Sequence, residues 1–243
     1  MRNIWTVFKR EFGYYFVSPV AYLVMFMFLV TLGLIFSYQL GAAAQFGGAP
    51  DVAGWVLGPF VTLALFLTEL LTMRLISEEH RTGTMELIMT APVREWELVA
   101  GKWLAALGYY GVILLVTLIY ALIANSVTQP GIDIATLAVS YLGIVLFVGA
   151  LLAIGLFTST LFSNQIAAAF AALAIYLGLW LISLPFQDRA DTVGDVFNYL
   201  NISSHYDNFS TGVIALSDVT YFVTLILFFL FAASQMIESR RWR

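Results

Sequence analysis

Few residues in this chain are of the types that do covalent or metal chemistry. It has no cysteine, and its two histidines are His80 and His205. The sequence contains no HExxH, GxSxG or GxxxxGK(S/T) pattern, and Gly101-Lys102 lacks the earlier glycine and precedes Trp103. Thiolate metal sites and cysteine nucleophiles are therefore excluded. We expect no catalytic residues, no metal site and no ATP hydrolysis by this chain alone.

One acidic residue, Glu69, falls inside a long apolar stretch, where an ionisable group is a functional candidate by default. If Arg74 marks the membrane interface, Glu69 lies about 7 Å deeper and roughly 140° around the helix. We expect Glu69 to face the bundle interior or a wet cavity, either protonated or paired with another helix. A structural pairing and a place on a transport path both stay open.

The elements that must position these residues are strongly apolar. Of 243 residues, 61% are apolar, 16% aromatic and only 11% charged, and the mean hydropathy is +0.90. Soluble domains carry about 25% charged residues. This composition excludes a soluble enzyme and a disordered chain, and it predicts an integral membrane protein.

Six stretches are long enough for a membrane-spanning helix, which needs about 20 apolar residues. They are 19–38, 55–76, 103–124, 136–162, 166–186 and 219–237. None alternates with the period of two that is typical of a transmembrane barrel. The first run is longer than the roughly 7–15 residues of a signal peptide, so we expect it to be retained. We predict one all-α integral membrane domain over 1–243 with six transmembrane helices.

The basic residues predict the orientation, because cytoplasmic loops are enriched in Lys and Arg. All of them except Arg189 lie before span one, between spans two and three, or after span six. Both termini are therefore predicted to be cytoplasmic. His80 and His205 then lie on opposite sides of the membrane and cannot share a metal.

The segment before the first span, residues 2–16, has amphipathic character. Trp5, Phe8, Phe12 and Tyr15 recur at helical spacing, while basic residues and Glu11 occupy the rest of the helix. This pattern predicts an elbow helix lying in the cytoplasmic interface. A frayed basic leader is the alternative.

The longest cytoplasmic loop runs from Ser77 to about Gly101 and carries both signs of charge. Gly83 permits a break after Glu78–Arg81, and Pro92 suits the first turn of a new helix. We expect a short helix across the membrane plane and a second helix leading into span three. A solvated connector is the alternative.

The last outer segment, residues 187–218, places Tyr206, Phe209, Val213 and Leu216 at helical spacing. A short helix dipping into the outer leaflet would bury that face. A plain surface helix is nearly as well supported.

The inner loop carries the most specific pattern in the chain. TMRLISEEHRTGTMEL from Thr72, followed by TAPVREWELVAGKW from Thr90, resembles the membrane subunit of ABC-2 type transporters. The pattern looks closest to the permeases of gliding-motility-associated ABC systems. Further fragments agree in order, namely KREF near the start, SNQI after span four, HYDNFSTGVI in the outer segment and ESRRW near the end. The resemblance covers essentially the whole chain.

The resemblance implies an elbow helix, a coupling helix that docks into a cytoplasmic ATPase, and re-entrant outer helices. On this sequence the implied coupling residues are Glu78, Glu79, Arg81, Gly83, Thr84 and Glu86. The implied re-entrant residues are Tyr206, Phe209, Gly212 and Val213. Two positions depart from the family pattern, which has a second basic residue at His80 and a proline or apolar residue at Glu69.

These implications predict a permease subunit of an ATP-driven ABC exporter in a bacterial cytoplasmic membrane. Its expected partners are a cytoplasmic ABC ATPase that binds ATP and Mg²⁺, a second permease copy or similar chain, and membrane lipids. We expect no cofactor on this chain and no nucleic-acid partner, and an outer-side accessory subunit stays open. The apolar, Phe-rich spans favour an amphiphilic or lipid-linked cargo.

Two alternatives remain for the function. A membrane anchor or force-transmitting component of an ABC complex would share the coupling loop but move no solute. An ion-coupled secondary transporter would usually show repeats, broken helices and several polar groups near the membrane midplane.

Overall fold

The computed structural model describes residues 2–46, 51–84, 93–127, 131–186 and 191–241. Every regular element within these ranges is helical, and no strand occurs there. Six helical segments are long and apolar enough to cross a membrane. The prediction of an all-α chain with six candidate spans is therefore confirmed.

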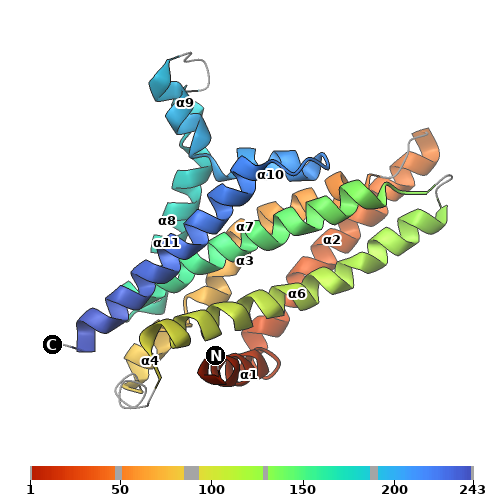
Figure 1. The fold of residues 1–243 in the computed structure, drawn as a ribbon. Coiled ribbons are helices and arrows are strands. Elements are labelled where there is room, and N and C mark those ends of the chain that lie inside the picture. The colour runs from red at the N-terminus through yellow and green to blue at the C-terminus, as the bar shows by residue number, and fades with distance from the viewer. Residues whose placement is uncertain (1, 47–50, 85–92, 128–130, 187–190, 242–243) are drawn as a thin grey trace.

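The long helices follow the predicted spans in order (Figure 1). They are α2 (Pro19–Phe46), α3 (Gly58–Thr72), α6 (Glu95–Val127), α7 (Ile134–Leu161), α8 (Gln165–Leu181) and α11 (Leu216–Arg241). The short elements are α1 (Arg2–Tyr15), the π-helical turn η1 (Ala53–Leu57), α4 (Ser77–Thr82), the 3-10 turn η2 (Leu184–Phe186), α9 (Thr192–Tyr199) and α10 (Ile202–Ser210).

The third span differs from its prediction, because α6 already begins at Glu95 and runs without a break to Val127. The predicted helix leading into span three is therefore the first part of α6 and is continuous with the span, whereas Pro92 lies outside the described residues. Glu95 and Glu97 lie in the first turn of α6, where the positive end of the helix dipole favours acidic side chains.

Within the second candidate span, Ala53–Thr82, α3 ends at Thr72 and a turn separates it from α4. Ser159 of α7 fixes this turn, because its hydroxyl oxygen accepts hydrogen bonds from the backbone amides of Ile76 and Ser77, both at 2.9 Å. Amides at a helix start have no partner within the helix, so Ser159 satisfies them from outside. α4 ends at Gly83, whose φ of 72° is the left-handed conformation that glycine tolerates best. The predicted break at Gly83 is confirmed.

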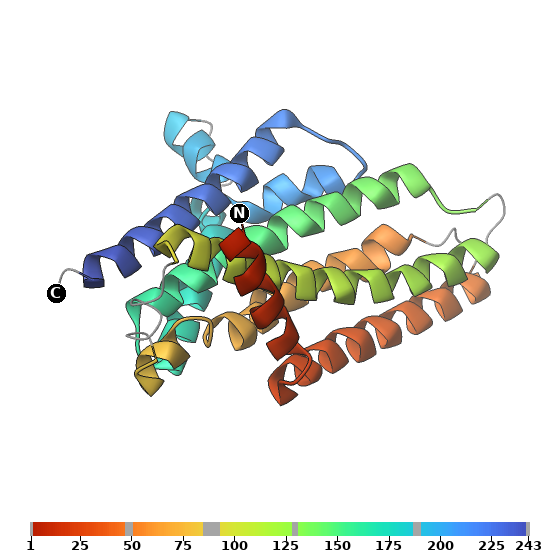
Figure 2. The same cartoon turned by 60° about the horizontal axis from the view of Figure 1, so that its bottom comes forward.

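The centre of the bundle is α7, which is buried on every side from Phe147 to Leu156. It contacts α3, α6, α8, α10 and α11. Its small residues Gly149, Ala150, Ala153 and Gly155 lie in this buried stretch, and small residues let neighbouring helices approach closely. Figures 1 and 2 show α1, α4 and the C-terminal end of α11 at one end of the bundle, called the α4 end below.

The N-terminal helix α1 crosses α6 and packs directly against it (Figure 2). Val7 lies over Gly101, and Tyr15 stacks on Tyr109 with ring centroids 4.9 Å apart. The predicted helix is confirmed, and the structure adds that one of its faces packs against α6. Trp5 is 56% exposed, and Glu11 faces the bundle instead of solvent.

The close approach of α1 to α6 requires a residue without a side chain at Gly101. A Cβ atom there would lie 2.7 Å from Cβ of Val7, a contact that only a backbone shift relieves. We therefore expect Gly101→Ala to destabilise the protein by about 1–3 kcal/mol. Thermal unfolding of the purified full chain, followed by tryptophan fluorescence, measures this effect.

Gly111 provides the matched control, because it lies in the same helix and a Cβ there would meet nothing within 4 Å. Alanine favours a helix over glycine by about 1 kcal/mol, so Gly111→Ala should leave the melting temperature unchanged or raise it. Equal melting temperatures for the two variants would contradict the packing of α1 on α6.

Candidate functional site

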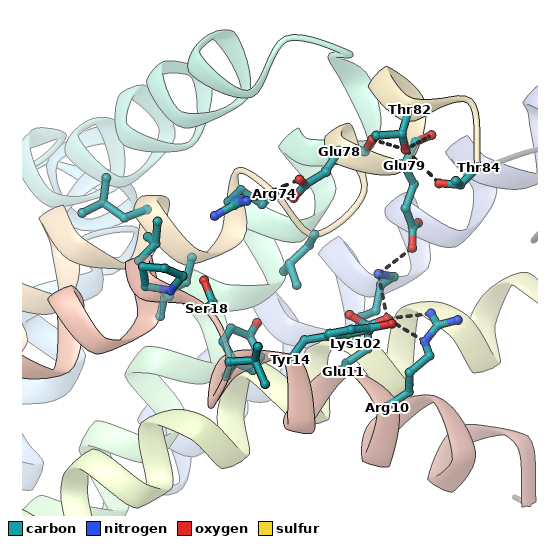
Figure 3. Close-up of a pocket in the computed structure, with 17 residues that line it drawn as sticks. Arg10, Glu11, Tyr14, Ser18, Arg74, Glu78, Glu79, Thr82, Thr84 and Lys102 are labelled. Carbon is teal, nitrogen blue, oxygen red and sulfur yellow. Dashed lines mark hydrogen bonds and ion pairs between the residues drawn. The ribbon is translucent and has the colours of Figure 1, made fainter.

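Three helices meet at a charged cluster at the α4 end (Figure 3). Nζ of Lys102 on α6 lies 3.2 Å from Oε1 of Glu11 on α1 and 2.9 Å from Oε1 of Glu79 on α4. Nη2 of Arg10 lies 2.6 Å from the same Glu11 oxygen. The Lys102 side chain is only 3% exposed. A buried ammonium therefore holds two carboxylates that belong to different helices.

The local sequence explains why these charges point inward. Lys102 continues the buried stripe of α6, one turn from Leu98 and three residues from Ala105. Glu11 lies one turn from Val7 and one turn from Tyr15, which are both buried against α6.

The neighbouring Glu78 makes a different set of contacts. Its carboxylate accepts from Nε and Nη2 of Arg74 at 3.1 and 3.3 Å, and Nη2 of Arg81 lies 3.9 Å away. These side chains are partly exposed, and exposed ion pairs contribute about 0–1 kcal/mol. Adjacent glutamates therefore differ, since Glu79 joins α4 to the bundle while Glu78 bonds within its own segment.

The implied coupling residues divide into a buried base and an exposed tip. Glu79 forms the base, whereas Arg81, Gly83 and Thr84 are exposed. The hydroxyls of Thr82 and Thr84 lie 2.9 Å apart across the turn. Glu86 lies outside the described residues. Among the described residues, the tip therefore presents exposed side chains and backbone to the surroundings.

A cleft of about 700 Å³ lies beside the cluster, between α1, the start of α2, the end of α3 and α4. Its charged residues are Arg10, Glu11, Arg74, Glu78, Glu79 and Lys102. Its aliphatic residues are Val17, Pro19, Val20, Leu70, Leu71 and Leu75. Figure 3 shows these side chains arranged around the opening.

Glu69 is buried within α3 with 4% of its surface exposed, which confirms that it faces the bundle interior. Neither carboxylate oxygen has a hydrogen-bond partner among the described residues, so the pairing with another helix is not found there. The two nearby threonine hydroxyls make hydrogen bonds with other groups. Thr68 bonds the Tyr110 hydroxyl at 2.8 Å, and Thr72 donates to the Thr68 carbonyl.

A second polar cluster joins α10 to α11 at the opposite end. Nδ1 of His205 lies 2.7 Å from Oδ1 of Asp218, and Nε2 lies 2.7 Å from the carbonyl oxygen of Tyr199. Asn208 donates to the other Asp218 oxygen at 2.8 Å. Both ring nitrogens of His205 therefore lie within hydrogen-bond distance of oxygen atoms. This cluster fixes α10 against the start of the last span.

The implied re-entrant residues are only partly on one helix. Tyr206 and Phe209 lie on α10 and are buried, and burial raises the pKa of the Tyr206 hydroxyl. The helical pattern predicted through Val213 to Leu216 is wrong beyond Ser210, because α10 ends there and Gly212 adopts a φ of 83°. Val213 is consequently exposed.

Sequence reasoning did not identify the ionic roles of Lys102, Glu11 and Asp218. The apolar periodicity around Lys102 and Glu11 was a usable signal, since it places both on buried faces. No group of three or more side chains that could hold a metal ion occurs among the described residues. The structure brings together Glu79 with Lys102 and Glu11, and it leaves Glu69 apart from this cluster.

Comparisons with known proteins identify the family of the sequence. A family model described as an ABC-2 family transporter protein matches residues 7–237. No curated protein matches the sequence.

The charged cluster predicts that Lys102 is required for stability. Lys102→Met leaves the carboxylates of Glu11 and Glu79 buried without their cation, and breaking such a buried pair costs about 3–5 kcal/mol. We expect a large loss of thermal stability of the detergent-purified chain, with partial recovery when Glu11→Gln and Glu79→Gln are added. Lys9→Met, at an exposed position of α1, is the matched control. A Lys102→Met protein as stable as this control would refute the cluster.

Proposed function

We propose, on the premise that this chain belongs to the ABC-2 family of transporter proteins, that it is the permease subunit of an ATP-driven exporter. The matched residues extend from α1 into α11, and hence across the six candidate spans. ATP and Mg²⁺ are assigned to a separate cytoplasmic ABC ATPase, because the sequence lacks a phosphate-binding glycine loop.

The observation that supports this proposal most directly is the combination of an exposed tip and a buried base in α4. Arg81, Gly83 and Thr84 form a surface that a cytoplasmic ATPase can contact. Glu79 joins the same helix to Lys102 of α6, and Ser159 joins its first turn to α7. A displacement of the tip would therefore be transmitted to two spanning helices.

The mechanism requires no bond chemistry in this chain. ATP binding would close two ATPase subunits and move the coupling helix α4 with them. The spanning helices would then change their contacts at the interface with a second permease copy or a similar chain. Such a subunit works through contacts that differ between two states.

The orientation follows from the distribution of basic residues, which favours a cytoplasmic α4 end with both termini inside a bacterial cytoplasmic membrane. The cluster of α10 with α11 would then lie on the outer side, as re-entrant segments do in this family. The order of the KREF, SNQI and HYDNFSTGVI fragments supports a relation to gliding-motility-associated permeases. An amphiphilic or lipid-linked cargo fits the apolar spans.

The exposed tip generates a test of the proposal. The Arg81 side chain is 64% exposed, so Arg81→Glu should leave thermal stability unchanged while it weakens attachment of the ATPase. We expect the amount of Walker-motif ATPase that co-purifies in mild detergent to fall on the order of tenfold, which equals about 1.4 kcal/mol. Mass spectrometry of the purified complex measures it.

Lys9→Glu is the control, because it makes the same charge change at an exposed position of α1. A stable wild-type protein that co-purifies without any ATPase would overturn the proposal. If both variants retain the ATPase equally, the coupling surface lies elsewhere than at the tip of α4.

Glu69 generates a second test, which separates function from stability. An unpartnered buried polar group costs about 1–3 kcal/mol, so Glu69→Leu should raise the melting temperature by a few degrees. If Glu69 serves transport, the same variant should slow export by the reconstituted complex. Thr68→Val is the neighbouring control, and it should lower stability because it removes the bond to Tyr110. A destabilised Glu69→Leu protein would show that the carboxyl has a structural partner.

A further inference from the structure

The cleft at the α4 end has two chemically different walls at the place where spanning helices leave the apolar layer. Leu70 and Leu71 of α3 and Val20 of α2 form an aliphatic wall, whereas α1, α4 and α6 contribute the charged wall. Its volume of about 700 Å³ falls within the range of roughly 300–1,000 Å³ that is typical of sites for small organic ligands.

Polar groups with unused hydrogen-bonding capacity line this cleft. Oε2 of Glu79 and the hydroxyl of Tyr15 are buried without a hydrogen-bond partner among the described residues. Burial raises the pKa of the Tyr15 hydroxyl, which therefore stays a neutral donor. Buried polar groups normally have partners, so two unpartnered groups in one cleft indicate that a ligand supplies them.

The arginines at the cleft also keep free donors. Arg74 uses Nε and Nη2 for Glu78, and Arg10 uses the same two nitrogens for Glu11. A guanidinium has five N–H donors, so each arginine can still bind a second oxygen group. Phosphate oxygens suit this geometry, because guanidinium groups bind them through paired hydrogen bonds.

The charge of the cleft selects among phosphate-bearing ligands. Arg10, Arg74 and Lys102 are balanced there by Glu11, Glu78 and Glu79. A purely anionic head group would meet these carboxylates, and a purely cationic one would meet the arginines. A zwitterion with a phosphate and a primary amine matches both signs, and its ammonium can donate to the unpartnered Glu79 oxygen.

We propose that this cleft binds an amine-bearing zwitterionic phospholipid of the adjoining leaflet. The phosphate contacts Arg74, the ammonium contacts Glu79, and the part of the acyl chain nearest the head group lies along Leu70 and Leu71. Leu70 and Leu71 precede Arg74 by four and three residues, about one turn of helix. Its consequence for transport rests on the proposed function. There α4 is the coupling helix, and because α4 forms one wall of the cleft, a bound lipid fixes the position of α4.

The test uses the full chain, delipidated in detergent and titrated with single phospholipids in native mass spectrometry. Phosphatidylethanolamine should bind at least tenfold more tightly than phosphatidylcholine, whose methylated amine cannot donate hydrogen bonds. It should also bind at least tenfold more tightly than phosphatidylglycerol, which lacks the amine. Glycerophosphoethanolamine, the same head group without acyl chains, should compete weakly.

Arg74→Gln should remove this preference, whereas Arg81→Gln should keep it. Both arginines pair with Glu78, but only Arg74 lines the cleft. Thermal unfolding of each variant verifies that it is folded, and Arg74→Lys serves as a second variant that keeps the charge but loses the paired donors.

Equal binding of the three phospholipids would overturn the proposal, as would preference for phosphatidylglycerol or full competition by the free head group. An equal loss in the Arg74→Gln and Arg81→Gln proteins would overturn it as well. No ATPase is present in this experiment, so its failure leaves the assignment as a permease subunit intact. Conversely, failure to recover an ATPase leaves the lipid site intact.

Discussion

The buried ammonium of Lys102 is the constraint on which the geometry of the α4 end depends. It is almost fully removed from solvent, and its two carboxylate partners come from α1 and α4. Removing charges from water costs several kcal/mol per ion, and their attraction roughly offsets this cost. The cluster therefore contributes little net stability. It does, however, make separation of the three helices costly, because moving any one helix away would leave a buried charge without its partner.

The same end of the bundle has a second, uncharged attachment with a complementary effect. Ser159 of α7 accepts from the amides of Ile76 and Ser77, so the start of α4 is fixed to the most buried helix of the protein. Glu79, further along α4, is fixed to α6 through Lys102. A short helix with one attachment could swivel. With two attachments to different helices, α4 moves only if α6 and α7 move with it.

The long helices were predictable, because a backbone in lipid must satisfy its hydrogen bonds internally and long apolar runs leave only that solution. The break at Gly83 was predictable from residue type, because glycine tolerates the left-handed conformation that ends α4. The pairing of Lys102 with Glu11 was not, since periodicity indicates that both are buried but not which charge meets which. Periodicity also misled at the end opposite α4, where apolar spacing continues past Ser210 although Gly212 turns the backbone out of the helix.

Lys102 and Glu69 are both ionisable side chains buried in spanning helices, and their surroundings separate their roles. Lys102 has both of its counterions within 3.2 Å, so its burial is compensated inside the chain and its role is to position helices. Glu69 has no hydrogen-bond partner in the part of the chain that the structure describes. Burial of its carboxyl group therefore destabilises the fold, and no hydrogen bond there compensates. Natural sequences keep such local conflicts mainly where function requires them. A group that the described residues leave unsatisfied is the place where a bound molecule or a neighbouring chain would gain most by supplying a partner.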